Sequence, residues 1–297
     1  MEINWGNCRL CPRECGANRQ TGKGACKSGN QLHIARAALH FWEEPPISGE
    51  RGSGTVFFTG CPLGCIYCQN REISQGFQPP GKSVSPEELS ALFFDLIAQG
   101  AHNINLVTPT HFMPLVREAL LIRKLPVPVV YNTSGYETVT ALRALEGLVD
   151  IYLPDFKYAD NGLAKELSRA PDYPEICVSA IEEMVRQAGQ PVYDGDGMMR
   201  RGVLIRHLIL PGHTANSIAV MEEISRRFPG IPVSLMAQYT PPEDFPEMEK
   251  HPELRRPITK REQQKVEDKL FSLGLEGFVQ LRSAKGNQYL PDFHQFE

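Results

Sequence analysis

The chain has 297 residues and a formal net charge of -4, with no block of basic residues, so its composition does not indicate a nucleic-acid-binding surface. Hydrophobic residues make up 41% and charged residues 22%, which permits a packed core and argues against a disordered chain. No apolar run approaches the roughly 18 residues of a membrane helix, and the N-terminus lacks the apolar region of a signal peptide, so we expect a cytoplasmic protein without a membrane partner.

Seven of the eight cysteines fall in two groups near the start of the chain. A disulfide framework would spread its cysteines through a small secreted domain, so this clustering in a long chain indicates metal binding. We expect a Cys-rich metal-binding extension over residues 1–50 and a second domain over residues 51–297. The two groups are Cys8, Cys11, Cys15 and Cys26, then Cys61, Cys65 and Cys68.

From residue 51 onward, short apolar runs alternate with helical patterns. The clearest helix spans 85–99, where Ser85 can cap the N-terminus, Pro86 suits the first turn and Glu88 completes a capping box. This alternation predicts an α/β fold with parallel strands, and six or seven such units fit a partial (β/α)6-type barrel better than a short open sheet. The expected strands are 55–58, 104–107, 127–131, 151–153, 203–210, 233–236 and 278–281, the other helices 114–123, 138–145, 181–188, 215–228 and 260–273, and the longer surface loops 171–174 and 241–257.

The second cysteine group has the spacing C-x3-C-x2-C and follows the first of these strands. Three thiolates at this spacing can hold three corners of a cubane iron–sulfur cluster, and no fourth cysteine follows nearby, so one iron stays open. An open iron can bind an amino and a carboxylate group, and the methionine part of S-adenosylmethionine (SAM) has both. Soft thiolates favour iron–sulfur clusters or zinc, and the alternatives are a zinc loop with a distant ligand or three structural cysteines.

This spacing, with the aromatic Tyr67 before the last cysteine, resembles the signature of the radical SAM superfamily. The resemblance implies a partial (β/α)6 barrel in which Cys61, Cys65 and Cys68 hold a [4Fe-4S] cluster that reductively cleaves SAM to a 5′-deoxyadenosyl radical. It also implies an electron donor such as flavodoxin or ferredoxin. Tyr67 then packs near the adenine of SAM, or it serves loop packing alone.

Barrel enzymes place their sites at the carboxyl ends of the strands, so the residues after each apolar run are candidates. After 104–107 the superfamily often has a Gly-Gly-Glu that holds the SAM amino group. This chain has Thr108 and Thr110 there, whose hydroxyls accept from an ammonium more weakly than a carboxylate does. His111 beside them is a further candidate, and a turn with an N-cap threonine is the alternative.

After the run 127–131, the stretch from Asn132 through Ser134 to Gly135 resembles the Asp-Thr-Asn-Gly stretch of activating enzymes for pyruvate formate-lyase. In those enzymes the Asp and Thr help to hold a cation beside SAM. Asn132 in place of Asp removes a charge, which argues against a cation site here. The alternative is a polar turn with Gly135 at positive φ.

The Asp155-Phe-Lys157 stretch resembles the Asp-Leu-Lys motif of the same activating enzymes, in which Lys157 would pair with the SAM carboxylate while Asp155 orients it. A charge inside an apolar strand is costly unless it points into a polar site, so we expect Arg206, or His207, at the barrel mouth. Gln238 follows the run 233–236, at the position of a SAM-contacting histidine in those enzymes. Because Gln238 is not a histidine, the resemblance gives only a position in the site and no chemical role.

The first cysteine group, Cys8-x2-Cys11-x3-Cys15-x10-Cys26, supplies four soft ligands, enough to close a zinc site or to hold an auxiliary iron–sulfur cluster. It resembles the N-terminal extension of pyruvate formate-lyase activating enzyme-like radical SAM proteins, and this resemblance covers nearly the whole chain. The remaining Cys177 is expected to be a small buried hydrophobe.

The sequence therefore supports a radical SAM oxidoreductase that activates a partner glycyl-radical enzyme by hydrogen abstraction. The first alternative is a radical SAM enzyme that modifies a small molecule or another protein, which the missing Gly-Gly-Glu and the extra cysteines favour. The second is a non-enzymatic metal-binding module, which the long barrel-like remainder and the missing fourth ligand after Cys68 argue against.

Overall fold

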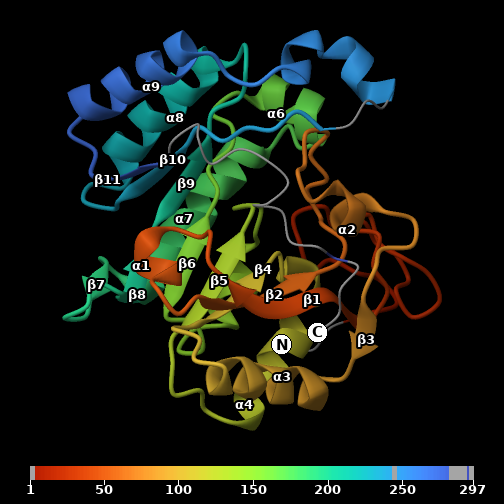
Figure 1. The fold of residues 1–297 in the computed structure, drawn as a ribbon. Helices are drawn as coiled ribbons and strands as arrows, with labels where there is room; N and C mark the ends of the chain where they lie inside the picture. Colours follow the sequence, from red (N-terminus) through yellow and green to blue (C-terminus); the bar gives the residue numbers. More distant parts are fainter. Residues whose placement is uncertain (1–3, 243–245, 281–292, 294–297) are drawn as a thin grey trace.

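The computed structural model describes residues 4–242, 246–280 and 293. Parallel strands form its centre, with helices packed outside them (Figure 1). The first four parallel strands are hydrogen-bonded neighbours: β2 (Ser53–Phe58), β4 (Ile104–Val107), β5 (Val129–Thr133) and β6 (Ile151–Pro154). Almost every residue of these strands is buried, because parallel strands are covered on both faces.

Beyond β6, the parallel strands continue with β8 and β9, which follow each other directly in the chain. β8 (Met199–Val203) pairs with β6, and β9 (Ile205–Leu208) pairs with β10 (Val233–Met236), which pairs in turn with β11 (Gly277–Gln280). The predicted strand 203–210 is therefore divided at Leu204, where the chain changes its pairing partner. A β-bridge between Asp155 and Arg206 joins β6 to β9 across the change. The predicted fold class, an α/β partial barrel, is confirmed.

Three further strands pair antiparallel at the edges: β1 (Leu32–His40), β3 (Lys82–Val84) and β7 (Val192–Tyr193). In the described residues the strand order is β3-β1-β2-β4-β5-β6-β8-β7 in one sheet and β11-β10-β9 in the other. The boundary predicted near residue 50 thus falls after a strand that pairs with β2 in the main sheet. The Cys-rich part before Leu32 contains no helix or strand among the described residues.

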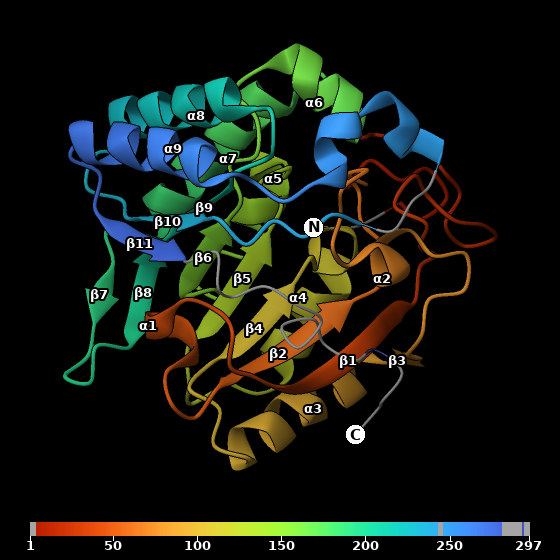
Figure 2. The same cartoon turned by 45° about the horizontal axis from the view of Figure 1, so that its top comes forward.

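The longer helices connect successive parallel strands. Figures 1 and 2 both place α8 beside α9 next to β9, β10 and β11. In Figure 1, α3 lies beside α4 at the opposite end of the molecule. No helix in the described ranges has the length and apolarity to cross a membrane. The helices are α1 (Pro45–Ser48), α2 (Arg71–Gln75), α3 (Pro86–Ala98), α4 (Met113–Ile122), α5 (Val139–Arg143), α6 (Asn161–Ser168), α7 (Tyr173–Ala188), α8 (Thr214–Arg227) and α9 (Lys260–Ser272).

The surface loop predicted at 171–174 is shorter than expected, because α7 already begins at Tyr173. Pro174 lies in the first turn of that helix, where its missing N–H costs no hydrogen bond. Within the loop predicted at 241–257, the structure has 3-10 helices η2 (Pro246–Lys250) and η3 (Pro252–Arg255), while residues 243–245 lie outside the described residues. Residue 281, the end of the last predicted strand, lies outside them too.

The capping box predicted for α3 is present. The Ser85 hydroxyl accepts from Glu88 N at 3.2 Å, and Ser85 N donates to Glu88 Oε2 at 2.7 Å. We expect Ser85→Ala to lower the free energy of unfolding by about 1 kcal/mol, because the N–H of Glu88 loses its partner. Urea denaturation measures the change. Ser83→Ala, at an exposed position of β3, is the control, and an equal loss in both variants would contradict the role of the cap.

Candidate functional site

A cavity of about 740 Å³ opens at the carboxyl ends of the parallel strands. Its volume lies in the range of small-molecule and cofactor sites. It brings together most of the residues that the sequence placed in the site, but not Thr110, His111 or His207. Those lining it are Cys61, Cys65, Tyr67, Cys68, Thr108, Asn132, Ser134, Asp155, Lys157, Arg206 and Gln238.

The three-cysteine loop leaves β2 through Gly60, which has φ of 81°. Ser74 Oγ donates to Cys68 Sγ at 3.3 Å, and Gln75 Nε2 donates to Cys65 O at 2.9 Å, so α2 holds the far side of the loop. Burial, together with the neighbouring thiols of Cys65 and Cys68, raises the pKa of Cys61 to about 12. Cys61 is therefore a neutral thiol unless a bound metal stabilises its thiolate.

These residues fit an iron–sulfur cluster with a ligand beside it. Among the described residues, no three His, Cys, Asp or Glu side chains converge on the position of a single metal ion. A cubane does not require such a point, because each thiolate binds a different iron. Ser134 Oγ and Gln238 Oε1 are buried and have no hydrogen-bond partner among the residues that the structure describes, and both residues line the cavity. A polar ligand would satisfy them.

Opposite charges converge on one wall of the cavity. Arg206 contacts Asp155 Oδ1 through Nε at 3.0 Å and donates to Asn132 Oδ1 at 2.6 Å, and Lys157 Nζ contacts Asp155 Oδ2 at 2.6 Å. Burial opposes ionisation of Asp155, but Lys157 and Arg206 outweigh it and hold the pKa of this carboxyl below its usual value. Burial also disfavours the charge of Lys157, but Asp155 raises its pKa, so the ion pair persists across physiological pH.

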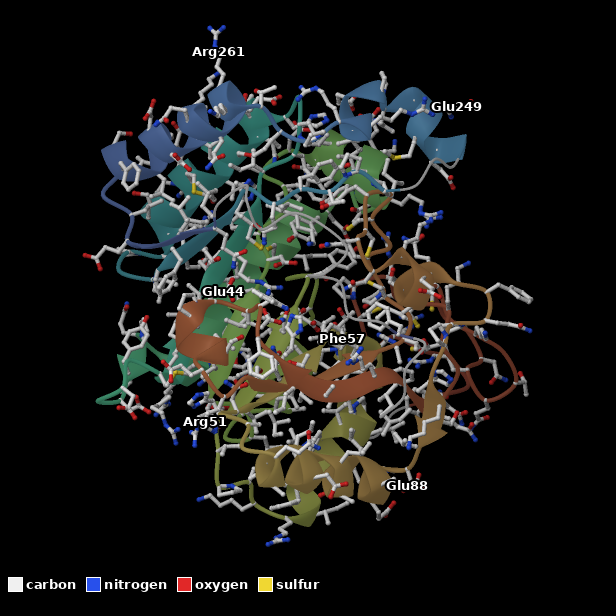
Figure 3. All side chains as sticks on the ribbon, in the orientation of Figure 1. Glu44, Arg51, Phe57, Glu88, Glu249 and Arg261 are labelled. Carbon is white, nitrogen blue, oxygen red and sulfur yellow. The ribbon has the colours of Figure 1, made fainter. Side chains whose placement is uncertain are left out.

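Glu43 completes this wall, and the sequence analysis missed it. Its carboxylate contacts Arg206 Nη1 at 3.0 Å and accepts from Asn132 Nδ2 at 3.2 Å. It follows β1, outside the predicted barrel, and only its place after the aromatic Phe41 and Trp42 marks it in the sequence. The next residue, Glu44, is 1% exposed and lies beside α1 (Figure 3), and burial raises its pKa, which favours the neutral acid.

Thr110 lies away from the cavity. Its hydroxyl donates to Glu137 Oε1 at 2.5 Å, and Thr133 Oγ1 donates to the same oxygen at 2.5 Å. Both hydroxyls thus donate hydrogen bonds to one buried carboxyl group. Desolvation raises the pKa of this Glu137 carboxyl to about 7. The cofactor role predicted for Thr110 therefore has no geometric support. His111 beside it is also buried, and its Nε2 donates to Thr59 O at 2.7 Å.

Besides Gly60, Thr108 and Gly135 at the strand ends have positive φ. Thr108 lines the cavity with φ of 57°, a conformation that a β-branched residue adopts at a cost of roughly 1–3 kcal/mol. Gly135, expected at positive φ from the sequence, has φ of 76°. An added Cβ there would lie 2.5 Å from Asp155 O and 2.8 Å from Cys177 Sγ, so no side chain fits beside the Asp155 backbone.

Tyr67 is buried, lines the cavity and accepts a hydrogen bond from the Tyr158 hydroxyl at 2.8 Å. The contact holds its ring against the barrel wall, which fits either the adenine contact or the packing role. Cys177 is fully buried within α7, in keeping with the role of a small hydrophobe. His207, the alternative to Arg206, points away from the cavity and binds Phe156 O and Ser217 Oγ.

The buried Glu137 makes stability depend on pH. Its folded pKa of about 7 lies above the ordinary 4.5, so its contribution is fully present below pH 4.5 and is lost as pH rises through 7. The loss amounts to roughly 3 kcal/mol at about 1.4 kcal/mol per pKa unit. We expect Glu137→Gln to flatten the free energy of unfolding between pH 4.5 and 7, measured by denaturation at several pH values. The exposed Glu118→Gln is the control, and an unchanged slope in Glu137→Gln would refute the assignment.

The comparisons with known proteins agree with this geometry. Residues 55–224 match the family model of the radical SAM superfamily. An uncharacterized protein of Methanocaldococcus jannaschii is 29% identical over 268 residues, which are 88% of this chain and 73% of that protein.

Two solved structures share the fold. A radical SAM methyltransferase from Sphaerobacter thermophilus is similar with a TM-score of 0.51 and 16% identity, over 77% of this chain and 66% of that one, just under two thirds of its length. Methylornithine synthase is similar with a TM-score of 0.50 and 13% identity, over 89% of this chain and 79% of that one. The chain therefore belongs to the radical SAM superfamily, whose members use a [4Fe-4S] cluster and S-adenosylmethionine.

Proposed function

We propose that this radical SAM enzyme activates a partner glycyl-radical enzyme by taking a hydrogen atom from a glycine Cα. The observation that carries the proposal is the joint placement of the cysteine loop and the activase-like strand ends on one cavity with an aromatic rim. Asn132 to Ser134, together with Asp155 and Lys157, line the same space as Cys61, Cys65 and Cys68.

Cys61, Cys65 and Cys68 would hold the cluster, and the charged wall would hold SAM. When bound, the cluster and SAM supply the one-electron cleavage that yields the 5′-deoxyadenosyl radical. Lys157 stays protonated, so its ammonium can donate a hydrogen bond to a carboxylate while Asp155 holds it in place. The unpartnered Ser134 Oγ and Gln238 Oε1 provide further polar contacts. The buried walls keep water away, as a reactive carbon radical requires.

The rim of the cavity supports a macromolecular substrate. Phe41 and Trp42 line the cavity, yet 48% and 54% of their surfaces remain exposed. Exposed aromatic side chains at the mouth of a site are typical of surfaces that bind a protein or peptide. A glycine-containing loop of a partner could pack on them and place its Cα in the cavity.

A second candidate function is modification of a small molecule or of a different protein. At the position where the superfamily often has a SAM-binding Gly-Gly-Glu, this chain has a segment in which Thr110 donates a hydrogen bond to Glu137. The amide of Asn132 is bonded to Arg206 and Glu43, so it does not supply the cation site suggested by the activating enzymes. Both features distinguish this site from that of the activating enzymes.

Single Cys61→Ala, Cys65→Ala and Cys68→Ala variants should reduce SAM cleavage to background, because a cubane that loses one thiolate is not retained. The measurement is 5′-deoxyadenosine formed anaerobically, with dithionite in place of the predicted flavodoxin or ferredoxin donor. Cys177 does not line the cavity, and Cys177→Ser, which keeps a donor to Asp155 O, is the matched control. Wild-type-like product from any of the three loop variants would exclude this assignment of the cluster.

Incubation with SAM, dithionite and a candidate glycyl-radical enzyme should produce the glycyl doublet in the EPR spectrum. We expect Trp42→Ala to raise the KM for the partner about 5- to 30-fold, the effect of removing 1–2 kcal/mol of aromatic contact, with a smaller change in the KM for SAM. The exposed Phe271→Ala on α9 is the control. SAM cleavage without a doublet in any candidate partner, but with a modified small molecule or protein by mass spectrometry, would favour the second function.

A further inference from the structure

The four N-terminal cysteines lie near one another. Among the described residues no three of them converge on the position of a single metal ion, so their arrangement suits a cluster, whose thiolates bind different irons, better than one ion. The Cys26 thiol interacts electrostatically with those of Cys8 and Cys15, and Cys11 interacts with Cys8 and Cys26. A Cβ added to Gly24 would lie 3.3 Å from Cys26 Sγ and 3.6 Å from Cys15 Sγ, so the absence of a side chain at position 24 leaves room beside both sulfurs. Cys15 is exposed, whereas the other three are buried.

A buried cation lies against this group. Arg19 is 1% exposed, and its guanidinium donates to Gly29 O at 3.0 Å, to His111 O at 2.8 Å and to Cys8 Sγ at 3.8 Å. The rings of Trp5 and Phe112 pack against it at 4.7 and 5.7 Å. Within the described part of the chain no carboxylate forms an ion pair with Arg19. A buried charge of this kind is costly unless an anion compensates it.

Neutral thiols cannot supply that anion, but metal-bound thiolates can. Four thiolates outweigh the two positive charges of a zinc ion or of an oxidised [4Fe-4S] cluster, so either centre is an anion. We propose that Cys8, Cys11, Cys15 and Cys26 hold a closed thiolate metal centre, separate from the SAM site, and that Arg19 is its counter-cation. Four protein ligands leave no open position, so the centre binds no substrate.

The proposed centre is joined to the cluster loop by the backbone. Cys61 N donates to Cys26 O at 3.1 Å. An added Cβ on Gly60 would lie 2.2 Å from Ser28 Oγ and 2.5 Å from Cys26 O, so the two segments are in contact. Arg13 donates from Nε to Pro62 O at 2.8 Å and from Nη2 to Leu63 O at 2.9 Å. Metal bound by the four cysteines would therefore fix the segment from which Cys61 projects.

The decisive experiment removes the SAM-site cluster and leaves the other centre in place. The full chain carrying Cys61→Ala, Cys65→Ala and Cys68→Ala together is purified anaerobically, and its zinc, iron and sulfide are counted per chain. We expect about one zinc, or about four irons with four sulfides, and the two outcomes identify the metal. A folded triple variant without metal would overturn the proposal, even if the wild-type chain cleaves SAM.

The thiol Cys15 gives a test that needs no substitution. As a free exposed thiol it should react readily with iodoacetamide, whereas as a metal ligand it should be protected until a chelator removes the metal. We expect at least about tenfold slower alkylation in the metal-loaded chain, read by mass spectrometry and independent of SAM cleavage. Alkylation of Cys15 at the rate of an exposed free thiol in metal-loaded protein would contradict the assignment.

The counter-cation is tested in the triple-variant background. Arg19→Met should release the metal to a chelator faster than Arg19→Lys, because only lysine keeps the positive charge. Arg261→Met is the control, since Arg261 projects from α9 into solvent (Figure 3). Equal metal release from Arg19→Met and Arg261→Met would remove Arg19 from the proposed centre and leave the four thiols alone.

Discussion

The ion pair between Asp155 and Arg206 supports both the fold and the site. The two residues form the β-bridge that joins β6 to β9, and their side chains meet at 3.0 Å. Arg206 also reaches Glu43 after β1 and Asn132 at the end of β5, so one side chain connects widely separated parts of the chain. Removing one partner of such a buried network leaves an unpaired charge, at a typical cost of about 3–5 kcal/mol.

This network also determines what the cavity can bind. Asp155 is already neutralised by Lys157 and Arg206, and Glu43 contacts the same guanidinium, so groups of both signs lie side by side on the described wall. A zwitterionic ligand suits such a wall better than a strongly charged one, because each of its groups finds a partner of opposite sign. The amino acid portion of SAM has this character. The buried polar atoms of Ser134 and Gln238 would be satisfied in the same way.

The strands and most of the cavity residues were predictable because local signals encode them. Runs such as Ile104–Val107 and Val233–Met236 coincide with β4 and β10, since parallel strands covered on both faces are continuously apolar. Arg206 was predictable because a charge interrupts such a run. Glu43 and Arg19 were not, because their partners lie far away in the sequence. The Glu43–Arg206 contact joins residues 163 positions apart and the Arg19–His111 contact residues 92 positions apart. The periodicity of apolar residues within one helix or strand does not predict contacts between such distant positions.

The docking of the N-terminal segment on the barrel has a consequence for biosynthesis. Arg13 donates to Ser168 O at 2.6 Å across 155 residues of sequence, so the segment cannot seat until that part of the chain has left the ribosome. At roughly 5–20 residues per second, the wait is on the order of 10–30 s. Throughout this interval the leading cysteines lack their barrel contacts, which makes the nascent chain vulnerable to oxidation before its native state can shelter them.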